Sequence, residues 1–262
     1  MQAPSLVIVG ANKGGVGKTT VARTLIEYFT IRDFDVTAYD TEFPRGGLTR
    51  YHPDIAQIID IRNTRHQCRL LDSLNTPNDV TIVDLKAGEL TRTLELLRDV
   101  GAFEAASNGS LNLTVLHLLG SSIASVSELE ETAKYQDMCK YFIVKNFINN
   151  SRFFANKKSY LQDLANKKSY LQDLANKKSY LQDLLKHSDE SKEIIVPRLN
   201  ALAYENVELA GLPFSSFVID EEDSKNPQRR SFVLRGYVKT WLERVWDNFE
   251  RAGLDDIVTH HT

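Results

Sequence analysis

Apolar and polar positions follow two kinds of pattern along this chain. Short runs of β-branched and apolar residues predict strands, beginning with Ser5–Val9. Six further runs predict strands at 35–39, 80–85, 111–118, 141–144, 193–196 and 216–219. Between these runs, apolar residues recur at helical spacing. The alternation predicts an α/β fold with a mostly parallel central sheet and helices on both faces.

Two helical stripes stand out. Leu90, Leu94, Leu97 and Val100 form the first. A wider, aromatic stripe comes near the end of the chain, and it consists of Leu234, Tyr237, Val238, Trp241, Leu242, Val245, Trp246 and Phe249. Helices that anchor at membranes also carry aromatic stripes, but the residues that follow this one are acidic rather than basic. We therefore expect the wider stripe to pack in the core.

A tandem repeat interrupts the α/β pattern. Residues 155–184 are ANKKSYLQDL written three times without a change. Because a helix advances about 100° per residue, each repeat falls about 80° short of three full turns. Successive apolar pairs would therefore rotate away from a single core. We interpret the repeat as an expanded surface helix; a basic helix that faces a partner or nucleic acid is the alternative.

Composition and length limit the possibilities. The 262 residues suit a single domain, 1–262, with the repeat as a helical insertion. A net charge of -3 means that any contact with DNA would need a local basic patch. The chain has no signal-peptide pattern and no membrane-spanning run, so we expect a cytoplasmic protein. Cys68 and Cys139 have no metal-binding spacing and are expected to be buried.

The segment that joins the first strand to the next helix is rich in glycine. Its end, Gly17-Lys18-Thr19, completes a phosphate-loop pattern. Glycines let backbone N–H groups turn inward, so the loop and the helix N-terminus can bind a polyphosphate. In this pattern Lys18 reaches the β- and γ-phosphates and the Thr19 hydroxyl binds Mg²⁺. The predicted nucleotide-binding residues of the loop are Gly14, Gly15, Val16, Gly17, Lys18, Thr19 and Thr20.

A second lysine in the loop, Lys13, is not required by this pattern. The stretch Lys13–Thr20, KGGVGKTT, resembles the deviant Walker A motif of the ParA/MinD family of P-loop ATPases (CobQ/CobB/MinD/ParA nucleotide-binding domain). The resemblance implies a homodimer that forms on ATP binding, in which Lys13 reaches the phosphates of the partner subunit. A cation supplied in this way offsets charge on the transferring phosphoryl group only when two subunits meet. A solvated loop lysine is the alternative.

Two aspartates at strand ends match further positions of the family. The resemblance implies that Asp40 is catalytic and orients the attacking water. The family continues with a second Asp, which Glu42 only approximates. Val80–Asp84 resembles the Walker B strand, so Asp84 is the implied magnesium residue; an aspartate that caps a turn is the alternative. The family then generally has Thr-Pro-Pro, where this chain has Leu85-Lys-Ala-Gly-Glu89.

The resemblance also implies where the base binds. Asn146 ends a predicted strand at the position of an adenine-contacting asparagine, and Pro197 belongs to a loop that closes over the base. Guanine-specific relatives carry Asn-Lys-x-Asp, whereas Asn146-Phe-Ile-Asn149 lacks both the lysine and the acid. ATP with Mg²⁺ is therefore the expected ligand.

The family resemblance implies a slow, partner-stimulated ATPase that acts as a switch, with DNA as the cargo in plasmid partition or mobilisation. A basic cluster near the last helix would contact phosphates, although it is equally an ordinary solvated face. Its members are Arg229, Arg230, Arg235, Lys239 and Arg244.

Three other functions are weighed against this one. A protein-positioning ATPase at a membrane would need a basic amphipathic tail, which the sequence lacks. An ATP-dependent metabolic ligase or amidotransferase-like enzyme would keep Lys18, Thr19 and Asp84 but would not need Lys13. An electron-transfer ATPase of the nitrogenase iron-protein type would need cysteines that share a cluster, and neither cysteine lies in such a motif.

Overall fold

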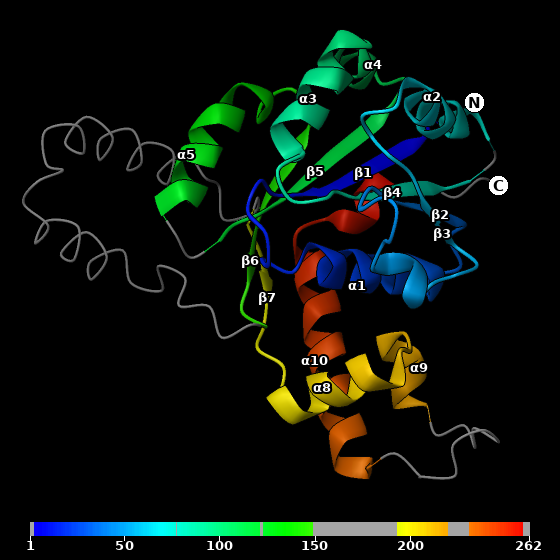
Figure 1. The fold of residues 1–262 in the computed structure, drawn as a ribbon, viewed down its shortest axis with the longest axis vertical. Coiled ribbons are helices and arrows are strands. Elements are labelled where there is room, and N and C mark those ends of the chain that lie inside the picture. The colour runs from blue at the N-terminus through cyan, green and yellow to red at the C-terminus, as the bar shows by residue number, and fades with distance from the viewer. Residues whose placement is uncertain (1–2, 77, 121–122, 149–192, 220–230, 259–262) are drawn as a thin grey trace, which may run out of the picture.

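The computed structural model describes residues 3–76, 78–120, 123–148, 193–219 and 231–258. Strands and helices alternate along the chain as expected from the sequence (Figure 1). The elements are β1 (Ser5–Gly10), α1 (Lys18–Thr30), β2 (Val36–Asp40), η1 (Leu48–Arg50), β3 (Ala56–Ile58), α2 (Thr64–Asp72), η2 (Ser73–Asn75), β4 (Val80–Asp84), α3 (Leu90–Asp99), α4 (Ala102–Ser107), β5 (Asn112–Leu118), α5 (Ile123–Thr132), η3 (Ala133–Tyr135), β6 (Lys140–Asn146), β7 (Glu193–Val196), α8 (Ala201–Ala210), α9 (Phe214–Val218), α10 (Phe232–Arg251) and η5 (Leu254–Ile257).

The strands form one sheet of seven, in the order β3-β2-β4-β1-β5-β6-β7, and every pairing in it is parallel. At its centre Ile8 of β1 lies opposite Val83 of β4 and Val115 of β5. Since all strands run the same way, the loops that follow β1, β2 and β4 meet at one edge of the sheet. Ligands bind at this carboxyl edge in open α/β sheets.

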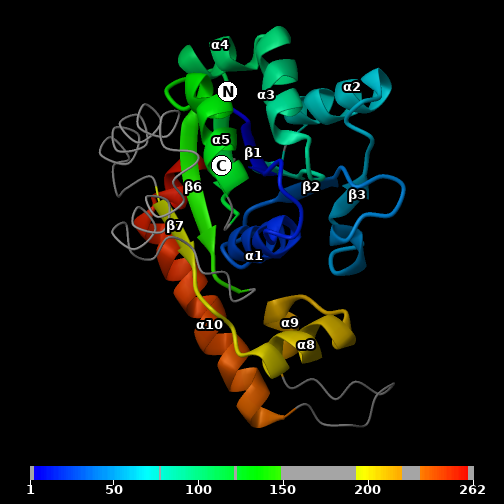
Figure 2. The same ribbon diagram turned by 60° about the vertical axis from the view of Figure 1, so that its left-hand side comes forward.

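Helices cover both faces of the sheet (Figures 1 and 2). Alternate residues of β1 divide between two buried clusters, because successive side chains of a strand point to opposite faces. Val7 and Val9 pack with α1, α8, α9 and α10, whereas Leu6 and Ile8 pack with α2, α3 and α4. The predicted fold class, a mostly parallel sheet with helices on both faces, is confirmed.

The two predicted stripes pack in the core. Leu90, Leu94 and Leu97 of α3 are buried, and Val100 lies half exposed just after the helix ends. The wider stripe lies on α10, where the residues that face the core are Val238, Trp241, Leu242, Val245 and Phe249. The expectation for the cysteines is wrong in part, because Cys68 is exposed on α2 and Cys139 is only half-buried.

The strand predicted at 216–219 is wrong. Residues Phe214–Val218 form the short helix α9. The buried Glu27 carboxylate on α1 accepts hydrogen bonds from the backbone N–H groups of Phe214 at 2.9 Å and Ser215 at 2.6 Å. It thereby satisfies donors that a helix N-terminus leaves unpaired. Phe214 and Phe217, one turn apart, are both buried. The short edge strand β3 was not predicted.

Several expectations concern residues outside the described ranges. They are the repeat at 155–184, together with Arg229 and Arg230 of the basic cluster. Among the helices that the structure does describe, none combines the length and the apolar character needed to cross a membrane.

Candidate functional site

The glycine-rich loop runs from the end of β1 to the start of α1. Gly17 precedes the helix and has a φ of 90°, a left-handed conformation that glycine adopts without strain. A Cβ at this position would also lie 2.0 Å from Nδ2 of Asn146. The glycine is therefore required both by the turn of the chain and by a neighbour from the end of β6.

A cavity of about 260 Å³ lies over this loop at the carboxyl edge of the sheet. It brings together residues from the ends of β2 and β4 with residues of the loop. The residues that line it are Gly14, Gly15, Gly17, Lys18, Thr19, Thr20, Asp40, Glu42, Asp84, Leu85, Lys86, Ala87 and Tyr204. Most of the predicted phosphate-binding, catalytic and metal residues thus lie around one space.

Lys18 is a buried ammonium group at the base of the cavity. Its Nζ donates a hydrogen bond to the backbone carbonyl of Lys13 at 3.3 Å. Burial lowers the pKa of Lys18, and the nearby carboxylates of Asp84, Glu42 and Glu128 oppose that change. These carboxylates favour the charged ammonium, and together with the glycine backbone of the loop this ammonium can bind an anion such as a phosphate.

Lys13 and Val16 occupy different positions from the other loop residues. Neither belongs to the described residues that line the cavity. The Lys13 carbonyl faces Lys18, and the Val16 carbonyl accepts a hydrogen bond from Asn146 at 3.0 Å. Within one subunit, therefore, the Lys13 side chain is not part of the cavity wall.

Asp40 organises the loop that follows β2. Its Oδ1 accepts a hydrogen bond from the Glu42 N–H at 2.9 Å, and its Oδ2 accepts one from the Leu48 N–H at 2.8 Å. A Cβ on Gly46 would lie only 2.3 Å from Asp40 Oδ2, so the loop backbone packs directly on the carboxylate. Each carboxylate oxygen keeps a second lone pair, so Asp40 can also accept a proton or a hydrogen bond from the cavity.

Asp84 and Thr19 fit a divalent magnesium ion. Asp84 is buried, and its Oδ1 has no hydrogen-bond partner among the described residues. Burial raises the pKa of Asp84 to about 8, an effect that the hydrogen bond from Thr19 opposes. A cation at the unpartnered oxygen would restore the ionised form.

The described residues contain no cluster of three or more His, Cys, Asp or Glu side chains that could hold a metal. Mg²⁺ usually takes one or two protein oxygens and completes its shell with water and phosphate. A carboxylate beside a hydroxyl at a phosphate loop matches that requirement.

The two predicted base-binding residues do not line the cavity. Asn146 is buried; it donates to the Val16 carbonyl and accepts from the Ile148 N–H, both at 3.0 Å. The carbonyl of Pro197 accepts a hydrogen bond from Nε1 of Trp241 at 2.7 Å. In this structure both residues make contacts within the protein, and the predicted contact with adenine stays a prediction.

Two lining residues, Tyr204 and Lys86, were not singled out from the sequence. Tyr204 lies on α8, and its hydroxyl is 3.5 Å from the Thr20 hydroxyl. Its position on the helix that follows the predicted base loop at Pro197 was the available signal. Lys86 follows β4, in the stretch that departs from the family pattern.

Several solved structures are similar to this chain. A ParA family ATPase from Chlorobium tepidum TLS is 14% identical, with a TM-score of 0.52 over 92% of this chain and 98% of that chain. The septum site-determining protein MinD of Pyrococcus horikoshii OT3, complexed with Mg-ADP, is also 14% identical, with a TM-score of 0.49 over 93% and 96%. A nucleotide-binding protein from Archaeoglobus fulgidus, in complex with ADP, is 17% identical over 62% and 76%, with a TM-score of 0.40. At 14% identity, the match to the Chlorobium protein shows a similar fold and does not establish a shared function.

The family of the chain follows from a match to a family model, since no individual curated protein matches the chain. Residues 7–190, which include the glycine-rich loop, Asp40, Asp84 and Asn146, match the CobQ/CobB/MinD/ParA nucleotide-binding domain. With this match over most of its length and the P-loop NTPase fold around the cavity, the chain belongs to the CobQ/CobB/MinD/ParA family of nucleotide-binding proteins.

Proposed function

We propose that this chain is an ATP-dependent switch of the ParA/MinD type, which dimerises when it binds ATP and hydrolyses it slowly. The observation that carries the proposal is the single cavity in which Lys18, Thr19, Asp40 and Asp84 meet. Members of the family are P-loop ATPases, which supports hydrolysis of a nucleoside triphosphate.

Each residue of the cavity has a defined part in this proposal. The backbone N–H groups of Gly14–Gly17 and the ammonium of Lys18 bind the phosphates. Thr19 and Asp84 hold Mg²⁺, which neutralises charge on the phosphates when bound. Asp40 orients the attacking water through the lone pairs that its backbone hydrogen bonds leave available.

Lys13 acts across a homodimer in this proposal. Its side chain is not part of the cavity wall in one subunit, whereas its backbone contacts the buried Lys18. A lysine so close to the phosphate loop can contribute to the site of a second copy that approaches along the cavity mouth. The Lys13 ammonium would then reach the transferring phosphoryl group only in the dimer.

Plasmid or DNA partition, or mobilisation, is the proposed cellular role. The support on this chain is a pair of exposed basic side chains on α10, Lys239 and Arg244. Lys239 pairs only loosely with Glu243, at 3.9 Å. Arg235 is half-buried and donates to the Val218 carbonyl at 3.5 Å, so it is the weakest candidate of the three for contact with DNA.

The first test separates nucleotide binding from dimerisation. Lys18→Ala should abolish binding of Mg-ATP in calorimetry, because it removes the cation at the base of the cavity. Lys13→Ala should bind Mg-ATP normally but remain monomeric in light scattering and lose turnover. Lys140→Ala, at the opposite end of the sheet, is the matched control. Normal turnover by Lys13→Ala would contradict the proposed role across the dimer.

The second test addresses DNA. Asp40→Asn keeps one of the two acceptors for the loop backbone and should trap the ATP-bound state. We expect this variant to be retained on nonspecific duplex DNA with Mg-ATP but not with Mg-ADP, and retention should weaken steeply as salt rises. An absence of retention in both states, with ATP binding confirmed in the same sample, would exclude DNA as the cargo.

A further inference from the structure

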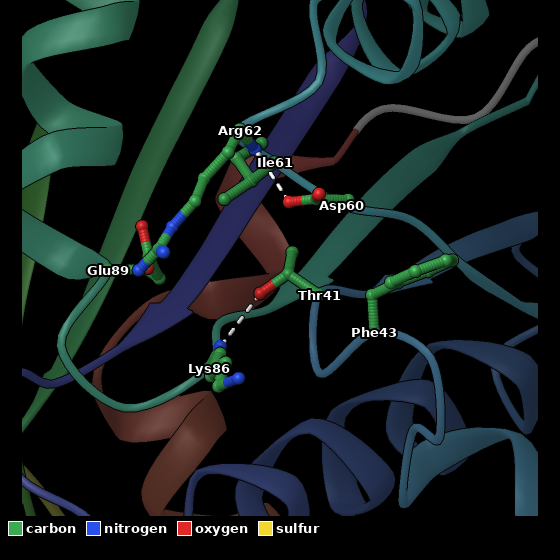
Figure 3. Close-up of a pocket in the computed structure, with 7 residues that line it drawn as sticks. All are labelled: Thr41, Phe43, Asp60, Ile61, Arg62, Lys86 and Glu89. Carbon is green, nitrogen blue, oxygen red and sulfur yellow. Dashed lines mark hydrogen bonds and ion pairs between the residues drawn. The ribbon is translucent and has the colours of Figure 1, made fainter.

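A second cavity adjoins the nucleotide cavity. It has a volume of about 200 Å³, and its lining residues are Thr41, Phe43, Asp60, Ile61, Arg62, Lys86 and Glu89 (Figure 3). Among the described residues, Lys86 is the one that lines both cavities. The loop after β4 therefore places a lysine on the wall between them.

The backbone of Lys86 is fixed in place. Its N–H donates a hydrogen bond to the hydroxyl of the buried Thr41 at 2.7 Å, the dashed line between these residues in Figure 3. This bond ties the loop after β4 to the loop after β2. A proline, which the family generally carries in this stretch, has no N–H and could not make it.

The side chain of Lys86 is not fixed in the same way. Lys86 is exposed, and its ammonium makes no hydrogen bond or ion pair with the part of the chain that the structure describes. Arg62, by contrast, extends toward Glu89 and pairs with its Oε1 (Figure 3). Lys86 is thus a cation on an anchored backbone, with space on two sides.

The charges around the nucleotide cavity favour such a cation. Three carboxylates, Asp40, Glu42 and Asp84, line the part formed by the loops after β2 and β4. In a phosphate-loop site the terminal phosphate lies beyond the loop on this side, because the loop itself binds the inner phosphates. Of the lining residues, Lys18 and Lys86 are the two that carry positive charge. Without Lys86, one ammonium would face three acids.

We infer that Lys86 binds the terminal phosphate of the nucleotide, as a second cation from the same subunit beside Lys18. This inference rests on the proposed ATP-binding function. Lys86 makes the contact with ATP and not with ADP, because ADP lacks the group that it binds. It therefore contributes to discrimination between the two nucleotides. Through its backbone bond to Thr41, the same residue connects the terminal phosphate to the loop that Asp40 organises.

The test compares affinities for two nucleotides. Lys86→Ala removes the ammonium but keeps the N–H that bonds to Thr41. Calorimetry with a non-hydrolysable Mg-ATP analogue should give an affinity at least about tenfold weaker than that of the unmodified chain, the usual scale for a charge-assisted hydrogen bond. Affinity for Mg-ADP should stay within about twofold, since the lost contact involves only the terminal phosphate. Lys86→Arg should retain most of the affinity for the ATP analogue, and Lys140→Ala should change neither affinity.

The outcomes distinguish this inference from the function on which it rests. Equal affinities of Lys86→Ala and the unmodified chain for the ATP analogue would overturn the inference alone. An equal loss for both nucleotides would overturn it too, since it would indicate a disturbed loop or a contact with an inner phosphate. If the unmodified chain binds neither nucleotide, the proposed function fails, and the inference fails with it.

Discussion

Asn146→Ala tests whether the asparagine at the end of β6 supports the phosphate loop from within the protein. The side chain is buried and makes two hydrogen bonds, one to the Val16 carbonyl and one from the Ile148 N–H, both at 3.0 Å. A typical intramolecular hydrogen bond contributes about 0.5–1.5 kcal/mol net. Loss of both bonds should lower the free energy of unfolding by about 2 kcal/mol, and the space left by the amide adds to this loss.

The measurement is urea unfolding of the nucleotide-free protein. Asn206→Ala is the matched control, because among the described residues its amide bonds only to the Leu202 carbonyl of its own helix. The change should cost less than about 0.5 kcal/mol. A loss for Asn146→Ala no larger than that of the control would refute the reasoning. Relative affinity for Mg-ATP and Mg-GTP tests the adenine contact separately: a structural role lowers both equally, whereas a contact with the base changes their ratio.

Three further predictions follow from buried contacts. Gly17→Ala should lower the free energy of unfolding in urea by about 2–3 kcal/mol, because it combines a left-handed φ with a clash against the side-chain amide of Asn146. Gly14→Ala is the control and should cost little, since its Cβ would meet only the methyl group of Ala87, at 3.7 Å. Arg23→Met should lower stability by about 2 kcal/mol, measured the same way, since it breaks the 2.6 Å ion pair between the buried Arg23 and Glu208, whose side chain is 33% exposed; a loss below about 1 kcal/mol would contradict this. Burial, together with the charge of Arg23, lowers the pKa of His52 to about 4, so the unfolded chain takes up the proton first as pH falls below about 6.5. Stability should therefore fall by up to about 3 kcal/mol between pH 6.5 and 4, and His52→Gln should remove that part of the fall in unfolding titrations, whatever the nearby acids contribute.

Local patterns predicted the strands well where they are long and central. The run at 80–85 corresponds to β4, and the run at 111–118 corresponds to β5. The failure at 216–219 has a physical cause in a distant residue. Apolar residues separated by serines are compatible with a strand, and it is the Glu27 carboxylate, far away in sequence, that caps this segment as a helix. The edge strand β3 has only three residues, too few for a periodic pattern.

The candidate site likewise has residues that the sequence predicts and contacts that only the structure shows. The phosphate-loop pattern predicted Lys18 and Thr19, and the family resemblance implied the roles of Asp40 and Asp84. Each of these residues ends a strand or lies at the start of a helix, and parallel strands bring such positions to one edge. What the sequence could not give is the partner of each polar group. The bond between Lys86 and Thr41 joins loops that are far apart in the chain, and no pattern in either loop indicates the other. That bond places Lys86 between two cavities, so its role depends on tertiary structure alone.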